Sequence, residues 1–233
     1  MISNRAVWVL IPAYNEAATI GKIISELKHF GFAGILVIND GSNDQTSKIA
    51  KENGAIVLDH VINQGVGAAI RTGLKFLKRE DAEWAIQIDG DGQHRLESIE
   101  GILKADSYDL VIGQRNWNRY KFGVLRKTAQ ILLLQTLKLN GVKKINDPTS
   151  GFRLFSKKAI DLLSTEMPSN FIGDTVEALI ISQRSGLRVT GVQVEMTERE
   201  HGESSHTGPK IVRAFFTAFL YSISYIPRRI KND

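Results

Sequence analysis

The chain of 233 residues contains no cysteine, which excludes disulfide bonds, cysteine-ligated zinc, iron–sulfur clusters and thiol nucleophiles. No uncharged apolar run approaches the roughly 20 residues that a membrane-spanning helix needs. No secretory signal opens the chain, because Met1–Arg5 leads directly into a strand-like segment. Walker A, Gly-x-Ser-x-Gly and His-Glu-x-x-His motifs are missing, and no Gly-x-Gly-x-x-Gly follows the first expected strand. These absences argue against P-loop NTPases, serine hydrolases, zinc proteases and nicotinamide-dependent enzymes.

The charge balance is mildly basic, with 30 Lys and Arg against 25 Asp and Glu, a net charge of +5. This bias favours anionic partners such as nucleotides, phosphates or an anionic lipid surface. It is too diffuse along the chain to indicate nucleic acid. Hydrophobic residues make up 42% and charged residues 24% of the sequence, which supports a folded domain with a core of its own.

The first 90 residues alternate between short apolar runs and segments of helical period. Such alternation predicts an α/β fold, with a mostly parallel sheet and helices on both faces. We expect strands at 7–11, 35–38, 55–58 and 84–88, and helices at 17–30, 46–53 and 66–77.

The second half is less regular. We expect strands at 110–113 and 188–195, a turn-rich strand at 147–155, and helices at 125–139 and 175–183. The chain then divides into a catalytic domain over 1–208 and an amphipathic helical tail over 209–233. The tail has an uncharged stretch, Ala214–Ile226, which as a helix is about 20 Å long and too short to span a bilayer core of about 30 Å. We expect it to lie in a membrane interface or to pack on the domain.

Polar clusters follow three of the expected strands: PAYNE at 12–16, NDGSND at 39–44 and DGDGQH at 89–94. Open α/β sheets bind ligands at the carboxyl ends of their strands. The three clusters should therefore meet at one edge of the sheet, although they are far apart in the sequence.

Asp89 and Asp91 carry the sharpest chemical signal, because residues at i and i+2 of an extended chain share a face. Two carboxylates about 4 Å apart repel by roughly 4 kcal/mol at an effective dielectric near 20. A hard divalent cation, Mg²⁺ or Mn²⁺, removes that repulsion. Gln93 could add a third ligand through its side-chain oxygen, and His94 is the alternative. The alternative is an Asx-turn with solvated carboxylates.

The other clusters each have a functional and a structural interpretation. The end of the first strand suits a polar or anionic ligand, with Tyr14 beside a base or ribose, but Asn15 could simply cap the next helix. Asp40 resembles the acidic residue that holds a ribose or base donor in dinucleotide folds. Gly65 opens either a weak phosphate loop or a tight loop with helix–sheet packing. Asp174 could serve as a general base for a hydroxyl acceptor or as a helix N-cap.

In combination, VLIPAYNEAATI, VINDGSNDQT, NQGVGAAIRTGL, IQIDGDGQH, DPTSGFRLF and REHGES, in that order, resemble family 2 glycosyltransferases of the GT-A fold. The dolichyl- and polyprenyl-phosphate hexose synthases are the most similar. The resemblance implies inverting transfer of a hexose from a UDP- or GDP-sugar to a polyprenyl phosphate, with Mg²⁺ or Mn²⁺ as cofactor. It implies metal ligands Asp89, Asp91 and Gln93, and catalytic residues Asp91, Arg115 and Arg199. Asp174 is the further catalytic candidate, as the base that a hydroxyl acceptor would need. The resemblance also implies substrate-binding residues Pro12, Ala13, Tyr14, Glu16, Asp40, Gly65, Asp89, Arg126 and Ser204, and it matches Glu177 to a family carboxylate.

The chain also departs from that family. A Gly-x-Ser-Lys pattern is common there, whereas this chain has Gly202–Ser205 without the lysine, so His206 or Lys210 are candidates to replace it. Transmembrane helices that follow the catalytic domain in many relatives are also missing. We expect a peripheral enzyme on the cytoplasmic face of a membrane, with a homo-oligomer as a further possibility. Two alternatives stay open: a glycosyltransferase with a soluble or protein hydroxyl acceptor, and a non-catalytic nucleotide-sugar-binding module.

Overall fold

The computed structural model describes residues 2–90, 98–115, 124–167 and 174–195. They form a seven-stranded sheet of order β3-β2-β1-β4-β6-β5-β7. Only β6 runs antiparallel to its neighbours, β4 and β5, so the expected mostly parallel α/β sheet is confirmed. The strands are β1 (Val7–Ala13), β2 (Gly34–Asn39), β3 (Ile56–Asp59), β4 (Trp84–Gln87), β5 (Leu110–Gln114), β6 (Arg153–Ser156) and β7 (Val189–Gln193).

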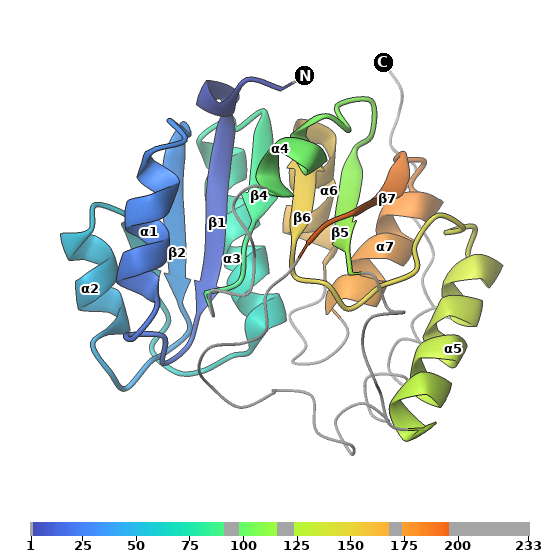
Figure 1. The fold of residues 1–233 in the computed structure, drawn as a ribbon, viewed down its shortest axis with the longest axis horizontal. Coiled ribbons are helices and arrows are strands. Elements are labelled where there is room, and N and C mark those ends of the chain that lie inside the picture. The colour runs from blue at the N-terminus through green and yellow to red at the C-terminus, as the bar shows by residue number, and fades with distance from the viewer. Residues whose placement is uncertain (1, 91–97, 116–123, 168–173, 196–233) are drawn as a thin grey trace.

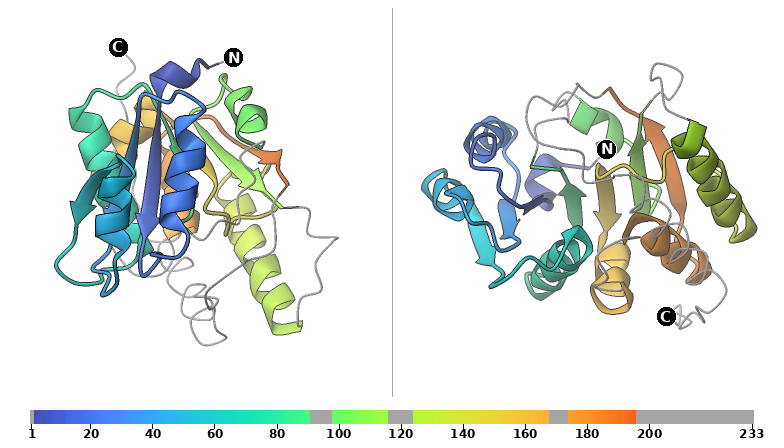
Figure 2. Two further views of the ribbon diagram at one scale, coloured as in Figure 1. Left: turned by 60° about the vertical axis from the view of Figure 1, so that its left-hand side comes forward. Right: turned by 90° about the horizontal axis from the view of Figure 1, so that it is seen from below.

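Helices cover both faces of this sheet, as Figures 1 and 2 show. One face carries α1 (Ile20–Lys28), α2 (Thr46–Glu52) and α4 (Ser98–Leu103), and the other carries α3 (Val66–Arg79), α6 (Lys157–Glu166) and α7 (Asp174–Arg184). The helix α5 (Val124–Leu139) contacts α7 and lies beyond the β7 end of the sheet. A short 3-10 helix, η1 (Asn4–Ala6), precedes β1.

The core is two apolar layers, one on each side of the sheet, because alternate residues of a strand point to opposite faces. In β1, Val9 and Ile11 join the layer under α1, whereas Leu10 joins the layer under α3. Gly73 of α3 lies directly over Leu10, and a Cβ at that position would be 3.0 Å from Leu10 Cδ2. The glycine therefore allows α3 to approach the sheet closely.

The structure corrects several expected boundaries. The helix expected over 17–30 begins only at Ile20, because Asn15 adopts a left-handed φ of 56° and the chain turns at Glu16–Thr19. The strand expected over 147–155 is limited to Arg153–Ser156, since side chains before it, such as Asp147, bond to their own loop. Helices α4 and α6 were not expected.

The predicted tail, 209–233, lies outside the described residues. Among the residues that the structure does describe, no helix combines the length and the apolar character needed to cross a membrane.

Candidate functional site

Hydrogen bonds between backbone and side-chain groups connect the loop after β1 to the loop after β2. The N–H of Asn15 donates to Ser42 Oγ at 2.9 Å, and the N–H of Asn43 donates back to Asn15 Oδ1 at 2.9 Å. The N–H of Glu16 donates to Thr46 Oγ1 at 2.8 Å. Asn15 therefore holds the neighbouring loop, and the alternative that it caps the following helix is wrong. These bonds place the PAYNE and NDGSND clusters side by side, as the sequence predicted.

The third cluster joins the other two through the turn after β4. The hydroxyl of Thr19 donates to the carbonyl of Gly90 at 2.7 Å, across 71 residues of chain. A Cβ at Gly90 would lie 3.4 Å from both the Pro12 carbonyl oxygen and Glu16 Cγ, and 3.7 Å from Ala13 Cβ. The prediction that the three clusters meet at one edge is thus confirmed for the described residues.

Asp89 lies at the centre of this edge, at the carboxyl end of β4, and is half-buried. Its carboxylate occupies the space in which residue 151 would otherwise carry a side chain. A Cβ built on Gly151 would be 2.5 Å from Asp89 Cγ and closer still to both carboxylate oxygens. The glycine of the DPTSGFRLF segment is therefore a cradle for the Asp89 carboxylate.

This arrangement fits one ligand of a hard divalent cation, because the Asp89 oxygens are the donor type that Mg²⁺ and Mn²⁺ prefer. Asp91 and Gln93, the other two predicted ligands, lie outside the described residues. Within the described ranges, no three or more His, Asp or Glu side chains gather closely enough to hold a metal by themselves. A set of three such side chains that includes Asp89 would therefore need residues outside the described ranges.

Asp40 follows β2 and is almost fully buried, with 3% of its surface exposed. Its Oδ1 accepts hydrogen bonds from the Gln64 N–H at 3.0 Å and from His60 Nδ1 at 2.7 Å, and its Oδ2 accepts the Gly65 N–H at 2.7 Å. Gly65 has a φ of +93°, which favours glycine. Because its N–H is already bonded to Asp40, the tight-loop interpretation of Gly65 fits better than a phosphate loop.

A further carboxylate, that of Asp44, adds negative charge near these loops. It accepts the Ala17 N–H at 3.1 Å and the Thr46 N–H at 3.0 Å. Burial raises the pKa of Asp44, but hydrogen bonds from Thr46 and Ala17 outweigh it, and the pKa is lower than usual. With Asp40 and Asp89, Asp44 makes a group of carboxylates at this edge, an arrangement that attracts cations and repels a bare phosphate.

Arg115, the residue after β5, is fixed by a bidentate ion pair with Asp147. Its Nε lies 2.6 Å from Asp147 Oδ2 and its Nη2 lies 3.1 Å from Oδ1, and Nη2 also contacts Thr149 Oγ1 at 3.1 Å. Asp147 is fully buried, whereas the Arg115 side chain keeps 20% exposure. Gln114 fastens the same loop by accepting the N–H groups of Asn146 and Asp147. Arg115 is thus positioned at the ligand edge, as expected, with its charge offset by a buried partner.

The sequence did not predict Asp147, Gly151 or Thr19 as site residues. The DPTSGFRLF motif was a signal for the first two, but their partners, Arg115 and Asp89, lie far away in the sequence. Of the remaining predicted residues, Tyr14 is 43% exposed beside Ala13 at the same edge.

Besides Asp91 and Gln93, several predicted residues are not placed with this group. Arg199 and Ser204 lie outside the described residues. Arg126 lies in the first turn of α5, and Asp174 is the first residue of α7, and only their backbones are described. Glu177, in the middle of α7, is buried.

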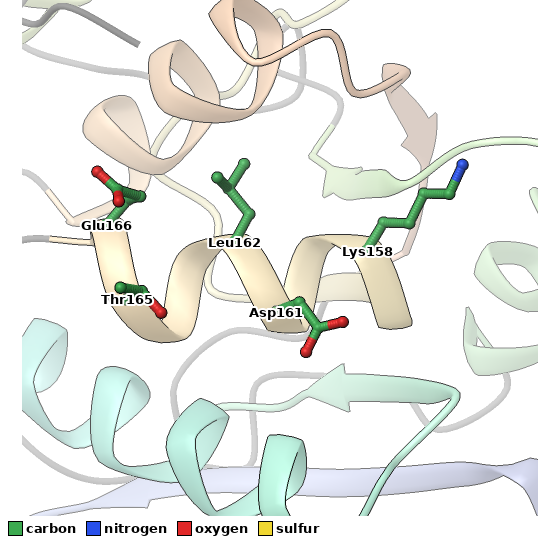
Figure 3. A pocket seen from close by; sticks show the side chains of 5 residues that line it. All are labelled: Lys158, Asp161, Leu162, Thr165 and Glu166. Atoms are coloured by element: carbon green, nitrogen blue, oxygen red, sulfur yellow. The ribbon is translucent and has the colours of Figure 1, made fainter. Parts of the chain in front are cut away.

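A hollow of about 310 Å³ is lined by residues of α6. Figure 3 shows its five lining side chains, Lys158, Asp161, Leu162, Thr165 and Glu166, all from that one helix. None of them is a candidate site residue, so the hollow is not the site predicted from the sequence.

Comparison with known proteins matches residues 8–163 to the family model "Glycosyl transferase family 2". The chain is 30% identical to UDP-N-acetylglucosamine–dolichyl-phosphate N-acetylglucosaminyltransferase of Methanococcus voltae, with 90% of this chain and 93% of the relative covered. It is 29% identical to polyprenol monophosphomannose synthase of Mycolicibacterium smegmatis, with coverages of 89% and 83%.

Among solved structures, glucosyl-3-phosphoglycerate synthase from Mycobacterium tuberculosis, in complex with Mn²⁺, UDP and glucosyl-3-phosphoglycerate, superposes with a TM-score of 0.74. The sequences are 19% identical, and the match covers 96% of this chain and 81% of that one. This likeness confirms the fold that the sequence predicted.

Proposed function

The chain belongs to glycosyl transferase family 2, and from that premise we propose that it moves a hexose, with inversion, from a nucleoside diphosphate sugar to a polyprenyl phosphate. The observation that carries the donor half of this proposal is the convergence at one sheet edge of Asp89, its Gly151 cradle and the Asp40 carboxylate. Ligands bind at this edge in open α/β sheets. Relatives named for dolichyl and polyprenyl phosphate support the acceptor half.

We assign Asp89, Asp91 and Gln93 to a Mg²⁺ or Mn²⁺ ion, which when bound would act as a Lewis acid on the diphosphate leaving group. Pro12 and Ala13 at the end of β1, with Tyr14 and Glu16 after it, would line the nucleotide together with Asp40. The wall formed by these loops is rigid before the ligand arrives, since hydrogen bonds join residues 15–17 to residues 42–46. Such preorganisation lowers the cost of binding.

In the transfer, an acceptor phosphate oxygen forms a bond to the anomeric carbon while the bond from that carbon to the diphosphate oxygen breaks. The acceptor phosphate is already ionised at neutral pH, so this step needs cationic groups for positioning more than a general base. Arg115 is the described cation best suited to this, because Asp147 and Thr149 hold its guanidinium in one orientation. Arg126 and Arg199 are further candidates for phosphate contacts.

The exposed face of α5 supports a lipid acceptor. Leu133 and Leu137 are buried on its inner side, whereas Ile131 is 55% and Leu139 is 88% exposed, with Lys138 exposed beside them. Apolar side chains with neighbouring cations are typical of helices that lie on anionic lipid. We propose that α5 rests on the membrane that holds the acceptor. Leu139→Ser should then reduce flotation with vesicles containing anionic lipid, and unchanged flotation of that variant would remove this support.

The activity is tested by incubating the protein with UDP- and GDP-sugars, polyprenyl phosphate vesicles and Mg²⁺ or Mn²⁺. We expect a nucleoside diphosphate to be released and the sugar to partition into organic solvent. Asp91→Ala should abolish transfer without unfolding the protein, while Asp174→Asn should keep substantial activity. Loss of activity in Asp174→Asn with a hydroxyl acceptor as substrate would instead favour the hydroxyl-acceptor alternative. Nucleotide binding without transfer to any acceptor would contradict the proposal.

A further inference from the structure

His60, the first residue after β3, connects the Asp40 carboxylate to helix α3. Its Nδ1 lies 2.7 Å from Asp40 Oδ1, and its Nε2 lies 2.9 Å from Thr72 Oγ1 on α3. The side chains of His60 and Asp40 keep only 9% and 4% exposure, so water competes little for these contacts. The backbone N–H of His60 also donates to the Asn39 carbonyl at 2.9 Å. The ring is therefore held at both of its nitrogens, and the backbone of the same residue is bonded to the end of β2.

The hydrogen-bond partners of the His60 ring determine which of its two nitrogens carries the hydrogen. A carboxylate only accepts hydrogen bonds, so Nδ1 must carry the hydrogen that lies between His60 and Asp40. In the neutral ring, Nε2 is then an acceptor, and the Thr72 hydroxyl donates to it. Asp40 thus selects the tautomer with the hydrogen on Nδ1, and the Thr72 hydroxyl holds the opposite side of the ring.

Asp40 has few acceptor positions left for anything else. A carboxylate has about four lone-pair positions, and His60 and the N–H groups of Gln64 and Gly65 take three of them. Within the part of the chain that the structure describes, Oδ1 accepts two of these bonds and Oδ2 accepts one, from Gly65. The remaining lone pair on Oδ2 is therefore aimed in a direction that His60 fixes from the other side of the carboxylate.

We propose that His60 is a positioning residue for the donor site: it orients Asp40 so that one Oδ2 lone pair accepts an N–H group of the nucleotide base. This inference rests on the proposed function, in which Asp40 contacts the nucleotide. His60 does not touch the ligand. His60 therefore strengthens nucleotide binding, and it does not change the rate at which the bound complex transfers the sugar.

The experiment measures the Kd of UDP and of GDP, each with Mg²⁺, by calorimetry on the full chain. His60→Phe keeps a ring but removes both hydrogen bonds, and we expect it to raise the Kd about tenfold or more. His60→Asn keeps an N–H donor near the position of Nδ1, and we expect a Kd within about threefold of wild type. The exposed His29, at the end of α1, provides the matched control His29→Phe, which should bind as wild type.

A merely structural role for His60 predicts a different pattern. His60→Phe would then lower the thermal midpoint but bind nucleotide normally at 25 °C, and this result would overturn the inference. So would equal weakening by His60→Phe and His60→Asn. In kinetics, we expect the donor KM to rise while kcat at saturating donor stays within about twofold.

Two more variants keep the test decisive. If His60→Phe does not fold, Thr72→Val takes its place: a rise in Kd of about threefold supports the inference, and wild-type affinity refutes it. Asp40→Ala distinguishes a failure of the proposed donor site from a failure of the positioning role of His60. Unchanged nucleotide affinity in Asp40→Ala would contradict the proposed donor site itself, whereas weakened affinity there with normal affinity in the His60 variants would remove only the positioning role.

Discussion

Gly151→Ala should disable the enzyme although it adds a single methyl group at a position remote in sequence from Asp89, the carboxylate that it would displace. The new Cβ would lie 2.5 Å from Asp89 Cγ, where ordinary carbon contacts begin near 3.5 Å. Asp89 must therefore move by about 1 Å. Gly151 does not have a left-handed φ, so alanine introduces no backbone strain there and the effect is steric.

The size of this displacement gives an estimate of the stability and the transfer rate that are lost. Overpacking of a filled space costs about 1–3 kcal/mol of stability, and a misplacement of about 1 Å at a reacting centre costs on the order of 100-fold in rate. We expect transfer to fall by about that factor and the metal concentration for half-maximal activity to rise. The assays are a titration of transfer rate with Mn²⁺ and chemical denaturation of both proteins.

A double-mutant cycle isolates the contact between the two residues. Asp89→Ala removes the carboxylate, so adding Gly151→Ala to it should cost little further stability, with a coupling of about 1–3 kcal/mol. Gly101→Ala in α4 is the control, because nothing lies within 4 Å of its added Cβ and transfer should be unchanged. Full activity of Gly151→Ala, or an equal stability loss with and without Asp89, would refute the reasoning.

Three further predictions concern neighbouring contacts. Thr19→Val removes the hydrogen bond to the Gly90 carbonyl and should cost about 1 kcal/mol with a weaker metal response, measured by denaturation and Mn²⁺ titration. Arg115→Ala leaves the buried Asp147 carboxylate without its ion-pair partner and should destabilise the fold by about 3–5 kcal/mol; a loss below 1 kcal/mol would contradict this. Burial raises the pKa of Asp59, but hydrogen bonds from three neighbouring side chains outweigh it and lower the pKa to about 2. Because this folded-state pKa is depressed, the stabilisation is complete above pH 3.8 and is lost as pH falls towards 2. The stability difference between wild type and Asp59→Asn, below about 1 kcal/mol for this exposed pair, should shrink over that window in acid denaturation.

The part of the sheet formed by β1 to β4 could be predicted from the sequence, because these four strands follow one another along the chain and lie side by side in the sheet. Apolar runs separated by segments of helical period indicated β1 to β4, and the polar residues after them indicated the ligand edge. The antiparallel β6 was harder, because it inserts between β4 and β5 and carries Arg153 in a buried strand. Charged residues interrupt the apolar pattern on which strand prediction depends.

The contacts that build the site were beyond the sequence for a different reason. Thr19 meets Gly90 across 71 residues, and Arg115 meets Asp147 across 32 residues. Each pair is brought together by the strand order, and no local spacing encodes it. Gly151 is the clearest case, since its role depends on the Asp89 carboxylate that lies against its Cα. A glycine in a turn-rich segment has many local explanations, and only the fold selects the cradle for Asp89.

The charges at this edge also explain why the reaction should depend on a divalent ion. Asp40 and Asp44 are held as hydrogen-bond acceptors by backbone N–H groups, and Asp89 adds a third carboxylate at the end of β4. A diphosphate approaching within about 4 Å of one such group is repelled by roughly 4 kcal/mol per pair of unit charges at an effective dielectric near 20. Arg115 cannot offset this alone, since Asp147 already balances its charge. Nucleotide and metal should therefore bind cooperatively, each raising the affinity of the other by the same factor.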